Sequence, residues 1–243
     1  MILILGGTAE ARALAARLVE AGEPVVSSLV GAVSAPRLPP GEVRIGGFGG
    51  AEGLAAYLAG HGVERVIDAT HPFAEAITAN AVAACSTAGV PLLRLSRPGW
   101  SGRSDAATWH WVPGIPEARS VAEELGERVF LSVGRGSLRL FDGWAGRYVL
   151  ARVADDTGLA VPPTWELIQA RGPFDLASEL DLLRGRRIDV LVTKDSGGEH
   201  TVAKLDAAAE LGVAVVMVQR PQDQPGLRCV ESVEAALEWA LAG

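Results

Sequence analysis

The chain has 243 residues, of which 49% are apolar, 5% are aromatic and 29 are glycine. That length suits two compact lobes, and that balance suits parallel sheets covered by helices with glycine-rich turns. The net charge of −7, without a basic run, argues against nucleic acid as a partner. The apolar start Met1–Leu5 is too short for a signal peptide or a membrane span, so we expect a cytoplasmic protein with no membrane partner.

Strands and helices are predicted to alternate through a first lobe, residues 1–98. It opens with a strand at Ile2–Leu5, a glycine turn, and a helix from about Ala9 to Ala21. Further elements are expected as strands at 25–29, 43–45, 66–68 and 91–95 and as helices at 51–60 and 73–88. Because each strand is followed by a helix, the sheet is predicted to be parallel.

Residues 99–116 are predicted to connect this lobe to a second one at 117–243. The stretch from Ser96 to Pro116 is rich in proline, glycine and tryptophan and shows little periodicity. The second lobe is expected to contain helices at 116–125, 174–183 and 230–241, one ending at Leu211, and strands at 129–133, 148–153, 190–193 and 213–218. The predicted fold is therefore α/β: two Rossmann-like lobes, each a mostly parallel sheet flanked by helices, with an interlobe cleft.

A weak internal repeat supports two similar lobes. Thr70, Gly89-Val90 and Arg97-Pro98 recur as Thr193, Gly212-Val213 and Arg220-Pro221, always 123 positions later. Duplication is one explanation. The other is that every strand-helix-strand unit needs a glycine cap and a short loop.

The N-terminal turn is the first candidate ligand site. Gly6, Gly7, Thr8 and Glu10 lie where a dinucleotide diphosphate rests on a helix N-terminus, whose free N–H groups attract anions. As a dinucleotide fingerprint the spacing is degenerate, because Thr8 and Ala11 replace the second and third glycines. The alternative is a tight turn capped by Thr8.

The end of the second strand favours NADPH over NADH. Val25–Gly31 contains no carboxylate to bind a ribose hydroxyl, so a 2′-phosphate would not be repelled there. Ser27 and Ser28 could donate to that phosphate, or could simply end a strand. The nearby glycine run at 46–50 needs permissive backbone, as in a loop that a ligand or the other lobe approaches closely, or in an ordinary turn. In the first case Gly47 is a candidate for contact with the coenzyme.

Two further loops follow strands at the edge where open parallel sheets bind ligands. In the first lobe, Thr70 and His71 are candidates for coenzyme contact, and His71 also for proton donation; capping is the alternative role for both. Asp68 could cap the next helix. In the second lobe, the loop Thr193–Gly198 combines a cation, a carboxylate, a hydroxyl and two glycines, and it makes Lys194 and Asp195 candidate catalytic residues.

Other types of site are not indicated. Cys85 and Cys229 suggest neither a disulfide nor a metal pair, and the four histidines lack ligand spacing, so no metal is expected. There is no phosphate-binding P-loop, nucleophile elbow, zinc helix or Tyr-x-x-x-Lys pair.

Several motifs together resemble the precorrin-6A reductase family of cobalamin biosynthesis, over essentially the whole chain. The motifs are Gly6-Gly7-Thr8-x-Glu10-x-Arg12, Gly46–Gly50, Asp68–Ala74, Arg97-Pro98-x-Trp100, and Thr193–Gly198 followed by Lys204 and Arg220-Pro221.

The resemblance implies an oxidoreductase acting on a CH–CH group. Its implied reaction is NADPH-dependent reduction of one double bond of precorrin-6A to give precorrin-6B, with hydride added to one ring carbon and a proton beside it. A polycarboxylate substrate suits arginine forks. The residues assigned to it are Arg97, Arg135, Lys194, Ser196, Gly197, Gly198 and Arg220.

Two other functions remain open from the sequence. A methyltransferase using S-adenosylmethionine would also begin with a strand and a glycine turn, although the second strand lacks the expected carboxylate. A two-lobed tetrapyrrole-binding protein would bind without oxidising NADPH. A shift in melting temperature with each ligand, and absorbance at 340 nm, separate these functions.

Overall fold

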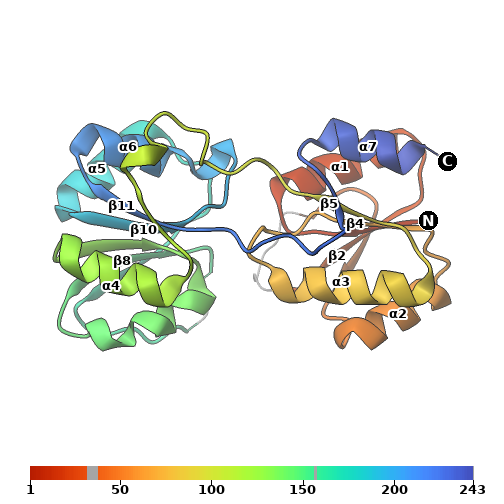
Figure 1. The fold of residues 1–243 in the computed structure, drawn as a ribbon, viewed down its shortest axis with the longest axis horizontal. Coiled ribbons are helices and arrows are strands. Elements are labelled where there is room, and N and C mark those ends of the chain that lie inside the picture. The colour runs from red at the N-terminus through yellow and green to blue at the C-terminus, as the bar shows by residue number, and fades with distance from the viewer. Residues whose placement is uncertain (32–37, 156–157, 243) are drawn as a thin grey trace. The chain divides into compact units, whose positions relative to one another are not determined.

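The computed structural model describes residues 1–31, 38–155 and 158–242. The chain forms two compact units (Figure 1). Unit 1 comprises Met1–Pro98 and Pro221–Gly243, and unit 2 comprises Gly99–Arg220. Each has a parallel sheet between layers of helices, which confirms the predicted α/β class.

The sheet of unit 1 has six strands within the described residues. They are β1 (Ile2–Leu5), β2 (Val25–Leu29), β3 (Glu42–Ile45), β4 (Arg65–Asp68), β5 (Leu92–Leu95) and β12 (Arg228–Val230). Their order across the sheet is β12-β5-β4-β1-β2-β3, and every pairing is parallel. The helices are α1 (Ala9–Glu20), α2 (Gly50–Gly60), α3 (Glu75–Ala88) and α7 (Val233–Leu241).

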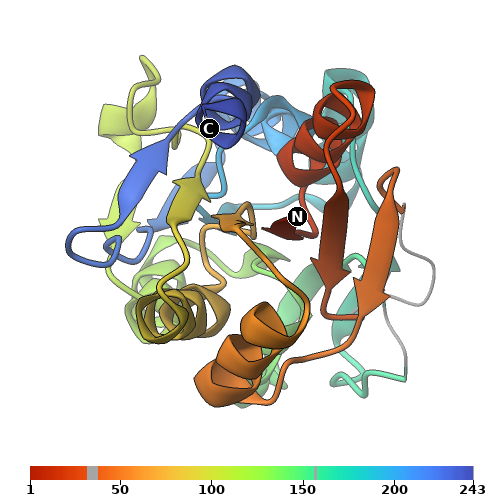
Figure 2. The ribbon, with the colours of Figure 1, turned by 90° about the vertical axis from the view of Figure 1, so that its right-hand side faces the viewer.

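Helices cover both faces of this sheet, with α1 and α7 on one side and α2 and α3 on the other (Figure 2). Leu14 and Leu18 of α1 pack on one face, whereas Leu54 and Leu58 of α2 pack on the other. All of β1 is buried, because a central parallel strand is covered on both faces.

Unit 2 repeats this arrangement. Its strands are β6 (His110–Val112), β7 (Arg128–Ser132), β8 (Tyr148–Val153), β9 (Trp165–Gln169), β10 (Val190–Lys194) and β11 (Ala214–Val218), in the parallel order β6-β11-β10-β7-β8-β9. Its α-helices are α4 (Ile115–Leu125), α5 (Leu176–Arg186) and α6 (Ala203–Leu211), and its 3₁₀ helices are η1 (Ala106–Thr108), η2 (Arg135–Trp144) and η3 (Glu199–Thr201). In Figure 1, α5 and α6 lie on one side of the sheet and α4 on the other.

The predicted division of the chain needs a correction at both ends of the second lobe. Residues 221–243 belong to unit 1, where β12 pairs with β5 and α7 packs against α1 (Figure 2). Residues 99–116 are not a mere connection, because they supply β6 and the start of α4 to unit 2. The reason is strand pairing. β12 comes after unit 2 in the chain but completes the sheet of unit 1, and β6 comes after residues 1–98 and completes the sheet of unit 2.

The sequence repeat marks these two exchanges. Arg97-Pro98 follows β5 and Arg220-Pro221 follows β11, so both Arg-Pro steps stand where the chain leaves one unit for the other. The repeated glycines Gly89 and Gly212 end α3 and α6 with φ of 66° and 68°. The repeat therefore corresponds to matched strand-helix-strand segments.

Three strands were not predicted from the sequence. They are β6, β9 and β12, and the expected helix at 230–241 begins only at Val233, after β12.

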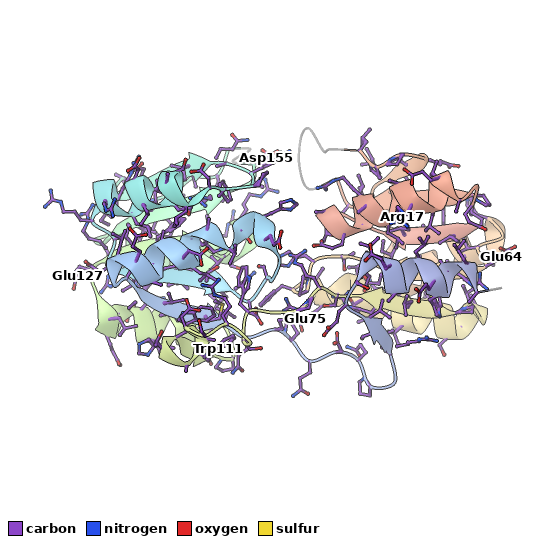
Figure 3. All side chains as sticks on the ribbon, turned by 90° about the horizontal axis from the view of Figure 1, so that it is seen from above. Arg17, Glu64, Glu75, Trp111, Glu127 and Asp155 are labelled. Carbon is purple, nitrogen blue, oxygen red and sulfur yellow. The ribbon has the colours of Figure 1, made fainter. Side chains whose placement is uncertain are left out.

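Charged side chains such as Arg17, Glu64 and Glu127 project from the surface (Figure 3). Within the described residues, none of the helices combines the length and the apolar character needed to cross a bilayer.

Candidate functional site

The glycine turn after β1 leads directly into the N-terminus of α1. Gly7 has φ of 118°, a conformation that favours glycine. Thr8 caps α1: its hydroxyl accepts from Ala11 N at 3.1 Å and donates to Ala69 O at 2.8 Å. The first amides of a helix have no partner within it, so those of Ala9 and Glu10 are available to an anion at this end.

The ends of β2 and β3 lie beside this turn. Gly6 N donates to Ser28 O at 2.9 Å, and Ser28 pairs with Arg44 on β3. Arg44 Nη1 donates to Ser28 Oγ at 3.3 Å. Ser27 points to the opposite face, which α1 covers, and is only 2% exposed. Of the two predicted serines, Ser28 is therefore the one placed beside a cation.

Arg44 was missed by the sequence prediction. It holds the glycine loop by donating to Gly46 O and, at 2.7 Å, to Gly47 O. Gly46, Gly49 and Gly50 have positive φ, so the expected permissive backbone is confirmed, although Gly47 itself is not in this region. The signal was an arginine in a short strand directly before a glycine run.

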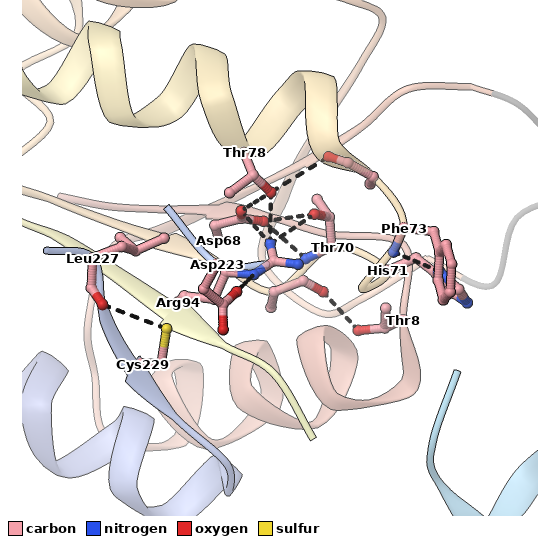
Figure 4. A network of polar contacts seen from close by, with 12 residues as sticks. Thr8, Asp68, Thr70, His71, Phe73, Thr78, Arg94, Asp223, Leu227 and Cys229 are labelled. Carbon is pink, nitrogen blue, oxygen red and sulfur yellow. Dashed lines mark hydrogen bonds and ion pairs between the residues drawn. The ribbon is translucent and has the colours of Figure 1, made fainter. Parts of the chain in front are cut away.

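A buried polar network fixes the end of β4 (Figure 4). Asp68 is fully buried and accepts from Thr70 N at 3.0 Å, Thr70 Oγ at 2.7 Å and Thr78 Oγ at 2.6 Å. Arg94 donates to the same carboxylate and to Thr78. These contacts stabilise the loop from β4 to α3, and Thr8 ties that loop to the glycine turn through Ala69.

His71 lies in that loop and is half-buried (Figure 4). Its Nδ1 accepts from Phe73 N at 3.2 Å, so in the neutral ring the proton is on Nε2. In this arrangement Nδ1 serves as a hydrogen-bond acceptor and holds the ring against the backbone of the loop.

An ion pair links the glycine turn to the end of β5. Arg97 Nη1 lies 2.7 Å from Glu10 Oε2, and both side chains are partly exposed. The Glu10 carboxylate therefore faces Arg97, while its backbone N–H belongs to the first turn of α1. Arg94, in contrast, is buried with Asp68 and does not offer its guanidinium to a substrate.

In unit 2 the corresponding strand end carries a cation. Lys194 ends β10 and donates from Nζ to Ser137 Oγ at 2.9 Å, and Ser137 lies in η2 two residues after the exposed Arg135. Ser196 N donates to Lys194 O at 2.6 Å in a tight turn. Gly197 and Gly198 then continue the turn with φ of 64° and 78°.

Asp195 holds together the two ends of unit 2. Its Oδ1 accepts from Trp100 N at 2.7 Å, and its backbone O accepts from Arg220 Nε at 2.7 Å. Arg220 Nε also lies 3.4 Å from Asp195 Oδ2. Because residues 99 and 220 are where the chain enters and leaves this unit, Asp195 has a structural task at this edge.

Metal and thiol chemistry have little support in the part of the chain that the structure describes. No group of His, Cys, Asp and Glu there could hold a metal ion. Burial raises the pKa of Cys85 to about 11, so its thiol stays protonated at neutral pH.

Comparison with known proteins identifies the family. Residues 1–241 match the family model described as precorrin-6x reductase CbiJ/CobK. The chain belongs to this family. A precorrin-6A reductase of Rhodococcus erythropolis is 49% identical over 98% of this chain and 96% of its own, and a cobalt-precorrin-6A reductase of Priestia megaterium is 32% identical over 93% and 92%.

A solved structure of the CbiJ/CobK family shows the same fold. It is titled CobK precorrin-6A reductase and superposes with a TM-score of 0.90 at 39% identity, over 98% of this chain and 94% of that one. The resemblance predicted from the motifs is thus confirmed. Membership places this chain among oxidoreductases of cobalamin biosynthesis.

Proposed function

We propose that the protein reduces one double bond of precorrin-6A with NADPH, giving precorrin-6B. The observation that carries the proposal is the match to the CbiJ/CobK family over residues 1–241. The glycine turn supports it independently, because a capped helix N-terminus behind a positive-φ glycine suits a coenzyme diphosphate.

The cobalt-free substrate is favoured by the degree of similarity. The Rhodococcus relative, named for precorrin-6A, is 49% identical to this chain, whereas the Priestia relative, named for cobalt-precorrin-6A, is 32% identical.

The carboxyl edge of unit 1 is proposed to hold the coenzyme. The backbone from Gly6 to Glu10, with the Thr8 cap, would bind the diphosphate, and Ser28 and Gly47 would lie along the adenosine. When bound, NADPH supplies the hydride. The fit rests on the positive φ of Gly7 and on the absence of a carboxylate in Val25–Gly31.

His71 and Thr70 are proposed to have different tasks at this edge. The Thr70 hydroxyl donates to Asp68, so it fixes the loop. His71 would then present its Nε2 hydrogen to the coenzyme. This assignment makes His71 a binding residue whose ring is held by the Phe73 amide.

The carboxyl edge of unit 2 is proposed to bind substrate carboxylates. Arg135 and Lys194 bring positive charge, and the turn of Ser196, Gly197 and Gly198 brings backbone and hydroxyl groups. Arg220, held by Asp195, would add a guanidinium fork. Arg97, held by Glu10 in unit 1, is proposed separately as a further contact of the substrate. Asp195 would then position Arg220 rather than act on the substrate.

Lys194 is the proposed proton donor. The reaction adds a hydride to one carbon and a proton to its neighbour. An ammonium near the second carbon can supply that proton, and the resulting amine then takes up a proton from water. Of the three catalytic candidates, His71 accepts from Phe73 N and Asp195 accepts from Trp100 N. Lys194 is held by a neutral hydroxyl, that of Ser137.

The reaction itself can be followed at 340 nm. Purified protein with NADPH and precorrin-6A should oxidise one NADPH for each precorrin-6A, and omitting the precorrin should stop the reaction. If NADPH is not consumed, and S-adenosylmethionine rather than NADPH raises the melting temperature, the proposal is wrong.

A further inference from the structure

Arg44 occupies a distinctive place at the carboxyl edge of unit 1. The glycine turn follows β1, Ser28 lies in β2 beside it, and Arg44 lies in β3 opposite Ser28. Neighbouring strands are about 4.8 Å apart, so Arg44 starts about 10 Å from the turn. Its side chain reaches back toward β2, where Nη1 donates to Ser28 Oγ at 3.3 Å.

The guanidinium of Arg44 is held in a fixed plane. One face packs on Phe48, with the guanidinium carbon 3.8 Å from the ring centre, and Tyr57 lies further away at 5.4 Å. The edge of the group donates to Gly46 O and Gly47 O. Holding a long side chain in one orientation before a ligand arrives lowers the entropy lost on binding.

Donor capacity remains on both side chains. Among the described residues, no acceptor is bonded to the Arg44 Nε–H or to the second hydrogen of Nη2. Ser28 Oγ accepts from Arg44 and so keeps its own hydrogen for donation. Nor does any carboxylate of these residues form an ion pair with Arg44, whose charge is thus uncompensated locally.

We propose that Arg44 and Ser28 bind the 2′-phosphate of the coenzyme and give the protein its preference for NADPH over NADH. The proposal rests on the proposed function, because it takes the diphosphate to lie at the glycine turn. In dinucleotide-binding folds the ribose lies at the end of the second strand, where a carboxylate selects NADH and an arginine accepts the extra phosphate. Here Ser28 lies one residue before the end of β2, with Arg44 turned toward it.

The competing role for Arg44 is purely structural, as a clamp on the glycine loop. Both roles predict that losing the side chain lowers stability. They differ in ligand selectivity, because only a phosphate-binding Arg44 distinguishes two ligands that differ by the 2′-phosphate alone. The test must therefore compare matched ligands rather than measure stability or activity.

Calorimetric titrations with NADP⁺, NAD⁺, adenosine 2′,5′-bisphosphate and 5′-AMP make this comparison. Arg44→Ala removes the side chain, and Arg44→Gln removes the charge while keeping an amide that can donate to Gly46 O. Both substitutions should lower the affinities for NADP⁺ and for the bisphosphate by about 10- to 100-fold. The affinities for NAD⁺ and AMP should fall much less, because neither ligand has the phosphate and any loss through the glycine loop is common to all four ligands.

Arg65→Ala is the matched control. Arg65 is also half-buried, donates to the backbone carbonyls of Ala240 and Ala242, and lies over the Trp239 ring. It begins β4, however, and so lies at the amino ends of the strands, away from the carboxyl ends where Arg44 acts. Its loss should leave the ratio of NADP⁺ to NAD⁺ affinity unchanged. If wild type prefers NADP⁺ and Arg44→Gln keeps that preference, this inference is wrong and the proposed function stands. If wild type binds neither coenzyme, both are wrong.

Discussion

The two units share one strand order but differ at their first crossover. In unit 1, Gly7 with φ of 118° leads into the 12-residue α-helix α1, capped by Thr8. In unit 2, Gly134 with φ of 80° leads into η2, a 3₁₀ helix without a side-chain cap. An α-helix end offers aligned amides to an anion, whereas the 3₁₀ helix is tighter and its hydrogen bonds are poorer. Unit 2 instead places cationic side chains, Arg135 and Lys194, at this edge.

A second difference lies at the carboxyl ends of β4 and β10, which occupy the same position in the two sheets. Unit 1 buries Asp68 with Arg94, whereas unit 2 sets Asp195 against the half-buried Arg220. Both carboxylates fix a loop at the ligand edge. In unit 1 the pair is wholly internal, while in unit 2 the arginine stays partly exposed. One topology thus accommodates the proposed backbone site for a diphosphate and the proposed side-chain site for carboxylates.

The largest expected effect comes from breaking the internal pair. Asp68→Ala removes the buried partner of Arg94, leaving it only the exposed Asp223 carboxylate 3.7 Å from Nε, and should lower the free energy of unfolding by about 3–5 kcal/mol. Hydrogen exchange measured by mass spectrometry should rise in residues 1–98 and also in 221–243, since both segments form unit 1. Protection of 99–220 should change little.

Glu64→Ala serves as the control for that experiment, because Glu64 is exposed and lies just before the same strand. Its exchange pattern should match wild type. If Asp68→Ala raised exchange in 99–220 while 221–243 stayed protected, the assignment of the last segment to unit 1 would be wrong.

The next largest effect tests the chemistry assigned to unit 2. Lys194→Met should lower kcat by about 100-fold, because a positioned acid is lost. Lys194→Arg keeps a positive charge but cannot give up its proton at neutral pH, so it should preserve KM better than kcat. A wild-type kcat in both variants, with an unchanged pH profile, would show that the proton comes from elsewhere.

Local patterns predicted the parts of the fold that depend on short segments. The opening strand, glycine turn and α1 follow from an apolar run, two glycines and the Thr8 cap, and all are confirmed. The short edge strands β6 and β12 were missed, because three residues carry no alternation to detect. Residues 221–243 were misplaced since β12 pairs with β5, whose residues lie far away in the sequence.

Prediction of the candidate site was limited in the same way, because only local sequence patterns could be used. The sequence indicated the turn and both strand-end loops, because glycine and polar residues directly after strands are local signals. It did not indicate that Asp195 bonds to Trp100, or that Glu10 faces Arg97, since these partners are 95 and 87 positions apart. The charged Arg94 inside the buried strand β5 was a signal of a buried partner.

A smaller effect is expected from replacing the glycine of the proposed diphosphate site. Gly7→Ala strains a backbone with positive φ at the proposed diphosphate site. It should lower the affinity for NADP⁺ by about tenfold in a calorimetric titration. Gly62→Ala is the matched control, because Gly62 also has positive φ, at 63°, and neither residue has atoms within 4 Å of an added Cβ. Equal affinities in the two variants would remove Gly7 from the site.

The smallest effect concerns the outer edge of unit 2. A hydrogen bond from Arg186, followed by one from Tyr148, lowers the pKa of Glu166 below its ordinary value of 4.5. A lowered carboxyl pKa stabilises the fold above the unfolded value, and this contribution is lost as pH falls through the folded pKa. Glu166→Gln should therefore cost at most about 1 kcal/mol at pH 7, because the pair is about one-third exposed.

Urea unfolding at several pH values tests this prediction. The difference between wild type and Glu166→Gln should shrink as the pH drops below 4.5, where wild-type Glu166 becomes protonated. A difference that grows on acidification would contradict the assigned pKa direction.

A crystal structure of the protein with NADP⁺ tests the central claim most directly. The account predicts diphosphate density within hydrogen-bonding distance of the amides from Gly7 to Glu10, at the start of α1. Density for the diphosphate at Gly134–Ser137 of unit 2, with none at the Gly7 turn, would contradict it.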